Sequence, residues 1–158
     1  PKTTEKLVRR LAKLPLVHID TSIILESEKT EDGYQCKKLL NIIGMKYRGK
    51  LSLVVLGELF LDIMSLEDYS EREDSAEFIF ALVKEKKIEH GIISNTLDNA
   101  SVNISNVDSR LEQADRLILA SASEDHADYL ATLDRKMIRN KKLEKELNIK
   151  IRHPKDLL

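Results

Sequence analysis

Apolar and polar residues follow two patterns along the chain. Short apolar runs predict buried strands, and longer segments whose apolar residues recur every three or four positions predict amphipathic helices. The predicted strands span residues 16–20, 51–55, 88–94, 128–133 and 149–152. Five helices are predicted over residues 4–14, 33–47, 70–86, 109–124 and 136–147. Two more have only one predicted boundary: one begins at about residue 22, and one follows the second strand and ends at about residue 65.

Local signals set the boundaries of these segments. Thr3 or Thr4 is expected to cap the first helix, and Pro15 to end it. The Arg-Gly-Lys sequence at 48–50 predicts a turn, whereas residues 95–107, rich in Asn, Ser and Thr, predict a loop or a weak helical turn. The helix predicted over 70–86 is expected to bury Ala76, Ile79, Phe80 and Val83. The helix predicted over 109–124 is expected to bury Leu111, Ala114, Ile118 and Ala122.

The order of the segments predicts an α/β fold. Strands separated by helices imply a mostly parallel sheet of four to five strands, with right-handed crossovers and helices on both faces. A chain of 158 residues without linkers or repeats is expected to form one domain over 1–158, in which residues 1–15 are a helical extension. Binding sites in such folds lie beyond the carboxyl ends of the strands.

Four acidic residues lie where predicted apolar strands meet turns or helices. Asp20 ends the first strand, Glu58 follows the second, Asp115 lies inside the helix over 109–124, and Asp134 follows the fourth strand. Carboxylates beside buried strands are costly without compensation. Because parallel strands end at one edge of a sheet, we expect the four side chains to converge there, where a divalent metal would compensate them.

The residue types favour metal-dependent chemistry. Two carboxylates can hold one Mg²⁺ or Mn²⁺, and further carboxylates can orient water or hold a second ion, as in phosphodiester hydrolysis. The sequence has no P-loop, no GxGxxG and no zinc-type Cys/His spacing. Its four histidines are dispersed, and His126, the one nearest to acids, is expected to be an exposed turn residue. Asp62, four residues after Glu58, is expected to be an exposed acid rather than an extra ligand.

Composition narrows the classes of protein. Apolar residues make up 42%, a globular share, and the apolar stretches fall short of the ~20 residues that span a bilayer, so no membrane partner is expected. The chain opens without a signal-peptide pattern. A single cysteine, Cys36, is expected half-buried on a helix, and its lack of a disulfide partner favours a reducing, cytoplasmic location.

Charge is unevenly distributed although the net charge is −1. Residues 58–77 contain eight acids and one base, whereas residues 135–155 contain nine bases and two acids. A basic face beside an acidic centre suits a metal-dependent enzyme that acts on a polyanion. Two oppositely charged, solvated helix faces explain the charges equally well.

Four motifs, in order along most of the chain, resemble the PIN-domain family of metal-dependent ribonucleases, which includes the VapC-type toxins. The motifs are HIDTSIILES, LSLVVLGELF, EQADRLILASA and DYLATLDRKM. The resemblance implies a three-layer α/β/α sandwich and endonucleolytic cleavage of RNA with Mg²⁺ or Mn²⁺. It also implies that Asp20, Glu58, Asp115 and Asp134 are the catalytic metal ligands. Thr21, Ser22 and Thr132 match positions whose hydroxyls support such a site.

Several expectations follow from this resemblance. Arg135, Lys136 and Arg139 are expected to hold the RNA backbone. A toxin would have a small antitoxin protein as its partner, and the apolar faces of the early helices favour a homodimer. The N-terminal helix lies outside the family's core pattern, and residues 95–107 form a longer polar stretch than the family's loop.

Simpler interpretations remain for each acid and for the whole chain. Asp20 is a good helix N-cap, Glu58 would favour a helix dipole, and Asp134 suits a turn before a helix. A structural role for Asp115, inside a helix, is the least favoured of these. A PIN-like RNA-binding or assembly subunit with little or no catalysis is the alternative function.

Overall fold

The centre of the protein is a five-stranded parallel sheet. The computed structural model describes residues 2–26, 30–85, 89–90 and 96–158. The strand order is β3-β2-β1-β4-β5, with β1 in the middle. The strands are β1 (Leu16–Ile19), β2 (Arg48–Leu51), β3 (Glu89–His90), β4 (Tyr129–Ala131) and β5 (Lys150–Arg152), and every pair is parallel. The predicted parallel α/β sheet is therefore confirmed.

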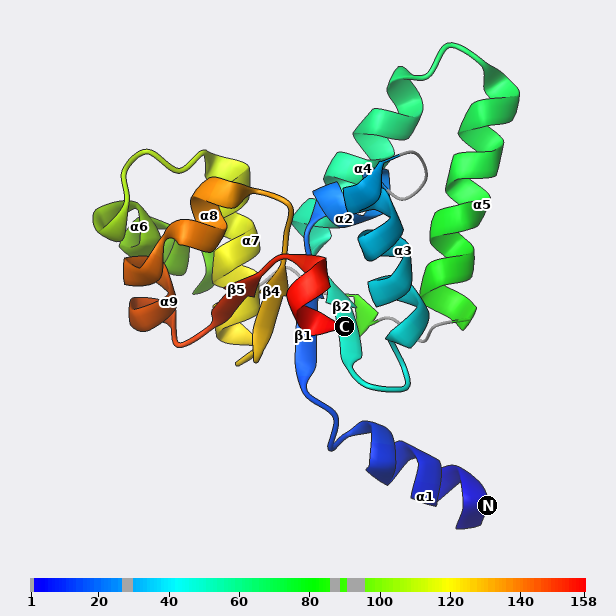
Figure 1. The fold of residues 1–158 in the computed structure, drawn as a ribbon. Helices are drawn as coiled ribbons and strands as arrows, with labels where there is room; N and C mark the ends of the chain where they lie inside the picture. Colours follow the sequence, from blue (N-terminus) through cyan, green and yellow to red (C-terminus); the bar gives the residue numbers. More distant parts are fainter. Residues whose placement is uncertain (1, 27–29, 86–88, 91–95) are drawn as a thin grey trace.

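Helices lie on both sides of the sheet (Figure 1). One group consists of α2 (Thr21–Leu25), α3 (Glu31–Ile42), α4 (Leu53–Ser65) and α5 (Tyr69–Glu85). The other consists of α6 (Thr96–Val107), α7 (Gln113–Glu124), α8 (Arg135–Arg139) and α9 (Lys141–Leu147). The short 3-10 helix η1 (Pro154–Leu157) packs against α3, and α1 (Lys2–Leu11) extends away from the rest. The resulting three layers match the predicted sandwich.

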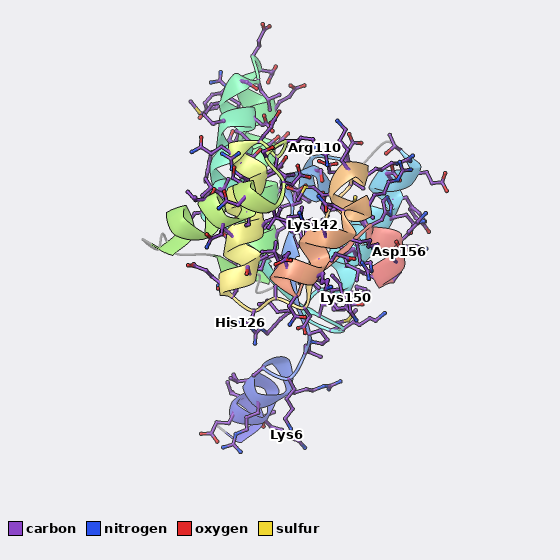
Figure 2. The ribbon with its side chains drawn as sticks, turned by 90° about the vertical axis from the view of Figure 1, so that its left-hand side faces the viewer. Lys6, Arg110, His126, Lys142, Lys150 and Asp156 are labelled. Carbon is purple, nitrogen blue, oxygen red and sulfur yellow. The ribbon has the colours of Figure 1, made fainter. Side chains whose placement is uncertain are left out.

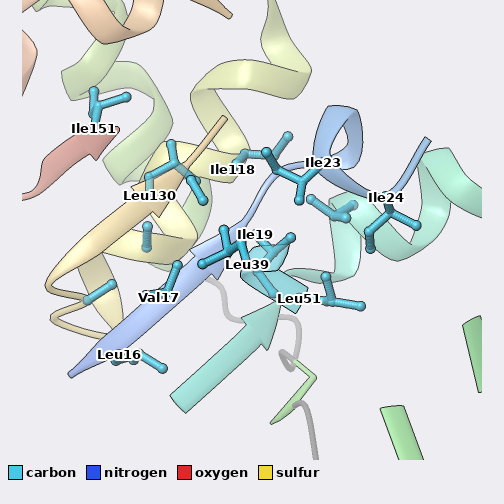
Figure 3. Close-up of a cluster of buried hydrophobic side chains, with 14 of the residues drawn as sticks. Leu16, Val17, Ile19, Ile23, Ile24, Leu39, Leu51, Ile118, Leu130 and Ile151 are labelled. Carbon is cyan, nitrogen blue, oxygen red and sulfur yellow. The ribbon is translucent and has the colours of Figure 1, made fainter. Parts of the chain in front are cut away.

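The core is built from aliphatic side chains of the sheet and its covering helices (Figure 3). All four residues of β1 are buried, as expected for a central strand covered on both faces. Ile23 of α2, Leu39 of α3 and Ile118 of α7 pack into the same cluster. Cys36 on α3 is fully buried, deeper than predicted.

The strand predicted over 51–55 is wrong in position. Arg48–Leu51, predicted in part as a turn, forms β2, and Leu53 begins α4. Ser52 decides this boundary, because its hydroxyl accepts a hydrogen bond from the backbone N–H of Val55 at 3.2 Å and so caps the helix. The apolar residues after Ser52 therefore form the first turn of α4.

Residues 96–107 form a helix where a loop or weak turn was predicted. Helix α6 packs along α7, and burial of Ile104 stabilises it despite its weak helix formers. The basic helix predicted over 136–147 is two helices, because Asn140 ends α8 and its side chain caps α9. Residues 88 and 91–94 of the predicted third strand lie outside the described residues.

Smaller differences concern helix ends and one core position. Helix α1 begins at Lys2, before the predicted threonine caps, α3 ends at Ile42 instead of residue 47, and α7 begins only at Gln113. Phe80, predicted to point inward, is 63% exposed, while Leu82 is buried in its place. Among the helices of the described residues, none is both long and apolar enough to cross a membrane.

Candidate active site

The candidate site lies at the carboxyl edge of the sheet, where β1 and β4 run side by side. After β1 the chain enters α2 on one face of the sheet, and after β4 it enters α8 on the opposite face. This is the point at which the strand order reverses, which is where ligand sites of open α/β sheets form. Asp20 continues the β1–β4 pairing, since its N–H donates to the carbonyl of Ala131 at 3.0 Å.

Asp20 is buried, with 8% of its surface exposed, and its carboxylate is fixed by three hydrogen bonds. Its Oδ1 accepts from the N–H of Thr21 at 2.8 Å, which caps α2. Its Oδ2 accepts from the hydroxyls of Ser22 at 2.9 Å and Thr132 at 2.7 Å. The capping interpretation therefore accounts for one oxygen of Asp20, and two further hydroxyls hold the other in a fixed direction.

Glu58 lies in the second turn of α4 and reaches the same edge. The hydroxyl of Thr21 donates to its Oε1 at 3.2 Å, so Thr21 joins Glu58 to Asp20. Burial raises the pKa of Glu58, the Thr21 hydrogen bond opposes this, and the negative charges of Asp20 and Asp62 raise it further. Because burial and the neighbouring acids destabilise the ionised form of Glu58, a nearby cation would stabilise that form.

Asp134 caps α8, as its turn interpretation predicted. Its Oδ1 accepts from the N–H groups of Lys136 at 2.8 Å and Met137 at 3.3 Å. Its own N–H donates to the hydroxyl of Thr132 at 3.0 Å. Thr132, which is fully buried, therefore contacts both Asp20 and Asp134. Asp20, Glu58 and Asp134 are linked in this way through the hydroxyls of Thr21 and Thr132.

Asp115 faces the other three acids from α7. It lies inside that helix, as predicted, and in its first turn, because α7 begins later than the apolar pattern indicated. Burial raises its pKa to about 6, and the negative charges of Asp20, Asp134, Glu112 and Glu58 add to the shift. A first-turn carboxylate normally gains from the helix dipole. Here burial and the other carboxylates outweigh that gain.

The donor chemistry fits a hard divalent cation. Carboxylates from four separate segments lie near one another at this edge, and hydroxyl groups donate hydrogen bonds to two of them, Asp20 and Glu58. Within the described residues, however, no three His, Cys, Asp or Glu side chains lie close enough to hold one metal ion together. As the side chains lie, a cation would draw on fewer than three of these carboxylates, with water or substrate oxygens in its remaining positions.

One acid near the site was missed by the sequence reasoning. Glu112 caps α7 by its position and adds to the charge acting on Asp115. The sequence did offer a sign of this role, because Glu112 precedes Asp115 by three residues, a spacing that places two side chains on one face of a helix. His126 is an exposed turn residue with a left-handed φ of 51°, as predicted, and Asp62 is exposed.

The three predicted RNA-binding residues lie directly after Asp134. Arg135, Lys136 and Arg139 are all exposed on α8. They therefore present positive charge to solvent beside the acidic edge, whether or not RNA is their ligand. Their role stays a prediction.

No protein-family model matches the chain, and no curated protein matches it. Solved structures do. A chain of FitAcB from Neisseria gonorrhoeae is 16% identical with a TM-score of 0.66, over 87% of this chain and 97% of that one. A chain of VapBC2 from Rickettsia felis, bound to a promoter DNA fragment, is 14% identical with a TM-score of 0.66, over 87% and 98%.

The toxin VapC20 from Mycobacterium tuberculosis, described as cleaving the sarcin-ricin loop, is similar over 72% of this chain and 86% of its own. It is 16% identical, with a TM-score of 0.54. The chain has the fold of the VapC toxins. The PIN-like architecture that the four motifs predicted is thereby confirmed. Sequence identities this low establish only the fold. The activity of this VapC-like chain has to be inferred from its own residues.

Proposed function

We propose that this chain is a Mg²⁺- or Mn²⁺-dependent endoribonuclease. The observation that supports the proposal is that hydroxyls of Thr21 and Thr132 link Asp20, Glu58 and Asp134 at the switch point of the sheet, and that the charges of these acids raise the pKa of Asp115. These acids come from four segments spread over more than a hundred residues, and local capping explains only part of their hydrogen bonding. The VapC-like fold supports the same activity.

The roles of the residues follow from their surroundings. Asp20, whose oxygens are fixed by three hydrogen bonds, is the best-oriented ligand for a cation. When bound, such an ion supplies Lewis acidity and a water of lowered pKa. Glu58 and Asp115 have raised pKa values, so a nearby cation stabilises their ionised forms most. Thr21, Ser22 and Thr132 hold the acids in position through their hydroxyls.

RNA is the proposed substrate. The exposed bases Arg135, Lys136 and Arg139 begin one residue after Asp134, so a phosphodiester at the acidic edge would have cations beside it. Phosphate oxygens of the RNA would also complete the coordination of a cation that the carboxylates only partly surround.

A small antitoxin protein is the proposed partner. The similar structures include a toxin-antitoxin complex from Klebsiella pneumoniae and VapBC-5 from Mycobacterium tuberculosis, a member of the VapBC family of toxin-antitoxin systems. In this chain the outer face of α4 exposes the large apolar side chains of Phe60, Leu61 and Met64. Clustered apolar side chains on a surface mark protein contacts. Growth arrest on expression, relieved by a co-expressed small protein, would support a toxin role.

Cleavage of RNA in defined metal conditions tests the enzymatic proposal. The wild-type chain should cut RNA with Mn²⁺ or Mg²⁺ and stop when EDTA is added. Asp20→Asn and Asp115→Asn should each lose most of this activity, whereas Asp156→Asn, an exposed acid of η1, should keep it. Full activity of both site variants would contradict the mechanism.

A binding subunit with little or no catalysis is the second candidate. The specific observation in its favour is that no three acids in the described part of the chain stand close enough to share a metal. Calorimetry with Mn²⁺ and gel-shift assays with RNA separate the two candidates. Binding of both without turnover on any RNA favours the subunit, and turnover that requires Asp20 favours the nuclease.

A further inference from the structure

Helix α1 extends away from the remaining elements in both views of the molecule (Figures 1 and 2). It precedes the start of β1, whereas Asp20 and the acidic edge follow the end of that strand. The N–H of Ala12 donates to the carbonyl of Val8 at 2.9 Å, and the N–H of Lys13 donates to the carbonyl of Arg10 at 3.2 Å. The helical path of α1 therefore continues as far as Lys13.

Four exposed bases follow one face of this segment: Lys6, Arg9, Arg10 and Lys13. Their spacing of three and four residues places them on one side of a helix, over about 10 Å of its axis. In the part of the chain that the structure describes, no acid forms an ion pair with any of them. Like charges at these spacings repel each other and weaken a helix, so this basic stripe gains from an anionic partner.

The helix dipole explains only part of the pattern. Arg9 and Arg10 lie in the last turn of α1, where the dipole favours a base. Lys6 lies in the middle of α1, where the dipole favours neither charge. A helix that is simply solvated usually mixes both signs along its face, whereas residues 6–13 contain four bases and no acid.

The other residues of α1 favour a nucleic acid over a membrane as the anionic partner. Helices that lie in a membrane surface carry several bulky residues such as Trp, Phe or Leu opposite their bases. Helix α1 has no aromatic residue, and its apolar residues are Leu7, Val8 and Leu11. A phosphate backbone needs no apolar contact, because neutralised phosphates release bound counterions.

We propose that α1 is an arm that holds the phosphate backbone of RNA outside the cleavage site. The proposal rests on the proposed function, because RNA bound at the acidic edge is the strand that would continue toward α1. The strand between them, β1, is about 13 Å long. One phosphate therefore cannot contact both places, and only an RNA that extends past β1 reaches the arm. The arm adds affinity for long RNAs, whereas the bases of α8 act on RNA of any length.

Binding measured without metal tests the arm, because RNA stays intact in EDTA. Fluorescence anisotropy is measured on the full chain with single-stranded RNAs of increasing length. The variant Lys6→Gln/Arg9→Gln/Arg10→Gln/Lys13→Gln should bind long RNAs about tenfold more weakly than the wild type. Its log–log salt slope should be smaller by about 0.7 for each phosphate contact that is lost. The shortest RNAs should bind both proteins equally.

Two control variants separate the stripe from total charge. Lys37→Gln/Lys142→Gln/Lys145→Gln/Lys155→Gln removes the same charge from exposed positions on α3, α9 and η1, and it should bind long RNAs like the wild type. Lys6→Arg/Lys13→Arg keeps the stripe charged and should also bind like the wild type. Equal losses in the two glutamine variants would overturn the proposal, because total charge would then explain them.

Three further results would overturn the arm. The first is long RNA that binds the α1 variant as tightly as the wild type, and the second is a loss of the same size at every RNA length. The third is binding to vesicles of anionic phospholipid that depends on the α1 bases while RNA affinity does not. Absence of cleavage by the wild type with Mn²⁺ would count against the nuclease alone, because the binding comparison needs no turnover.

Discussion

The hydroxyl of Thr132 donates a hydrogen bond of 2.7 Å to Oδ2 of Asp20, across 112 residues of sequence. The oxygen of that hydroxyl also accepts a hydrogen bond from the N–H of Asp134 at 3.0 Å. Thr132 is fully buried, so no water competes for either interaction. One threonine therefore sets the relative positions of two of the four acids.

Thr132→Val should damage both the fold and the site. Valine keeps the shape but leaves an oxygen of Asp20 with one hydroxyl donor fewer and the N–H of Asp134 without its acceptor. Loss of hydrogen bonds to buried groups costs about 1–3 kcal/mol, which urea unfolding would measure. RNA cleavage should fall at concentrations where the variant is fully folded.

Thr132→Ser is the matched control. Serine keeps the hydroxyl and removes a methyl group, so it should retain most of the activity that valine loses. Equal activity in the serine and valine variants would show that the hydroxyl does not position the site.

Asp115 should make the stability of the protein depend on pH. Its pKa is raised from 3.8 to about 6 by burial and by the neighbouring acids, so the folded state holds its proton more tightly than the unfolded state. Stability is then greatest below about pH 4 for this group and is lost as the pH rises through 6. Asp115→Asn should therefore be more stable than the wild type at pH 7 by about 1–2 kcal/mol, allowing for solvent screening of a half-buried group.

The advantage of Asp115→Asn should disappear near pH 4, where the wild-type carboxyl is protonated. Thermal unfolding at a series of pH values measures the difference, with Asp156→Asn as the exposed control. Added Mn²⁺ should stabilise the wild type more than the variant. A difference between the two proteins that is the same at pH 4 and pH 7 would contradict the assigned cause.

The sequence predicted the parallel sheet and the edge at which Asp20 and Asp134 meet, because both follow directly from strands separated by helices. It misplaced β2, because an apolar run after Ser52 is compatible with either a strand or a helix. The hydroxyl of Ser52 decides between them by capping α4, an interaction that exists only once the chain has turned. The helical α6 was missed for a related reason, since packing on α7 outweighs its weak propensity.

The sequence named four acids as candidate ligands, and their role stays a prediction, but it could not give the geometry around them. Nothing in the sequence distinguishes the two oxygens of Asp20, of which one caps α2 and the other receives two hydroxyls. The contribution of Glu112 to the charge around Asp115 depends on α7 beginning at Gln113, four residues later than the apolar pattern indicated. Side-chain geometry of this kind arises from tertiary packing.

A partly buried ion-pair cluster away from the site should contribute to stability in acid. Asp125 accepts from Nε2 of His18 at 2.7 Å and pairs with Nζ of Lys50 at 2.9 Å. Burial would raise the pKa of Asp125, but these two partners outweigh it and lower the pKa to about 2. Since the folded pKa lies below the ordinary value of 3.8, the cluster stabilises the protein above about pH 4, and this contribution is lost as the pH falls toward 2.

Asp125→Asn should therefore destabilise the protein at pH 7 by about 1.5–3 kcal/mol, the range for hydrogen bonds to charged groups. The penalty should shrink as the pH falls from about 4 toward 2, because the unfolded wild type takes up a proton on Asp125 below about pH 4 whereas the folded protein does so only near pH 2. Chemical unfolding at pH 7 and pH 3 measures this, with Glu146→Gln, an exposed acid of α9, as control. A penalty of the same size at both pH values would argue against a charge effect.

The bases of α8 should contribute to RNA affinity without regard to sequence. Arg135 and Arg139 are exposed beside Asp134, so each is expected to neutralise a phosphate and release bound counterions. Arg135→Gln/Arg139→Gln should weaken binding to unrelated RNAs by similar factors. The salt dependence of binding should fall by about 0.7 in log–log slope for each phosphate that is no longer neutralised.

Lys142→Gln/Lys145→Gln, which removes two exposed bases from α9, is the matched control. Fluorescence anisotropy over a range of salt concentrations gives both quantities. If the α9 variant changes the slope as much as the α8 variant does, RNA binds a diffuse basic surface and not the edge beside the acidic site.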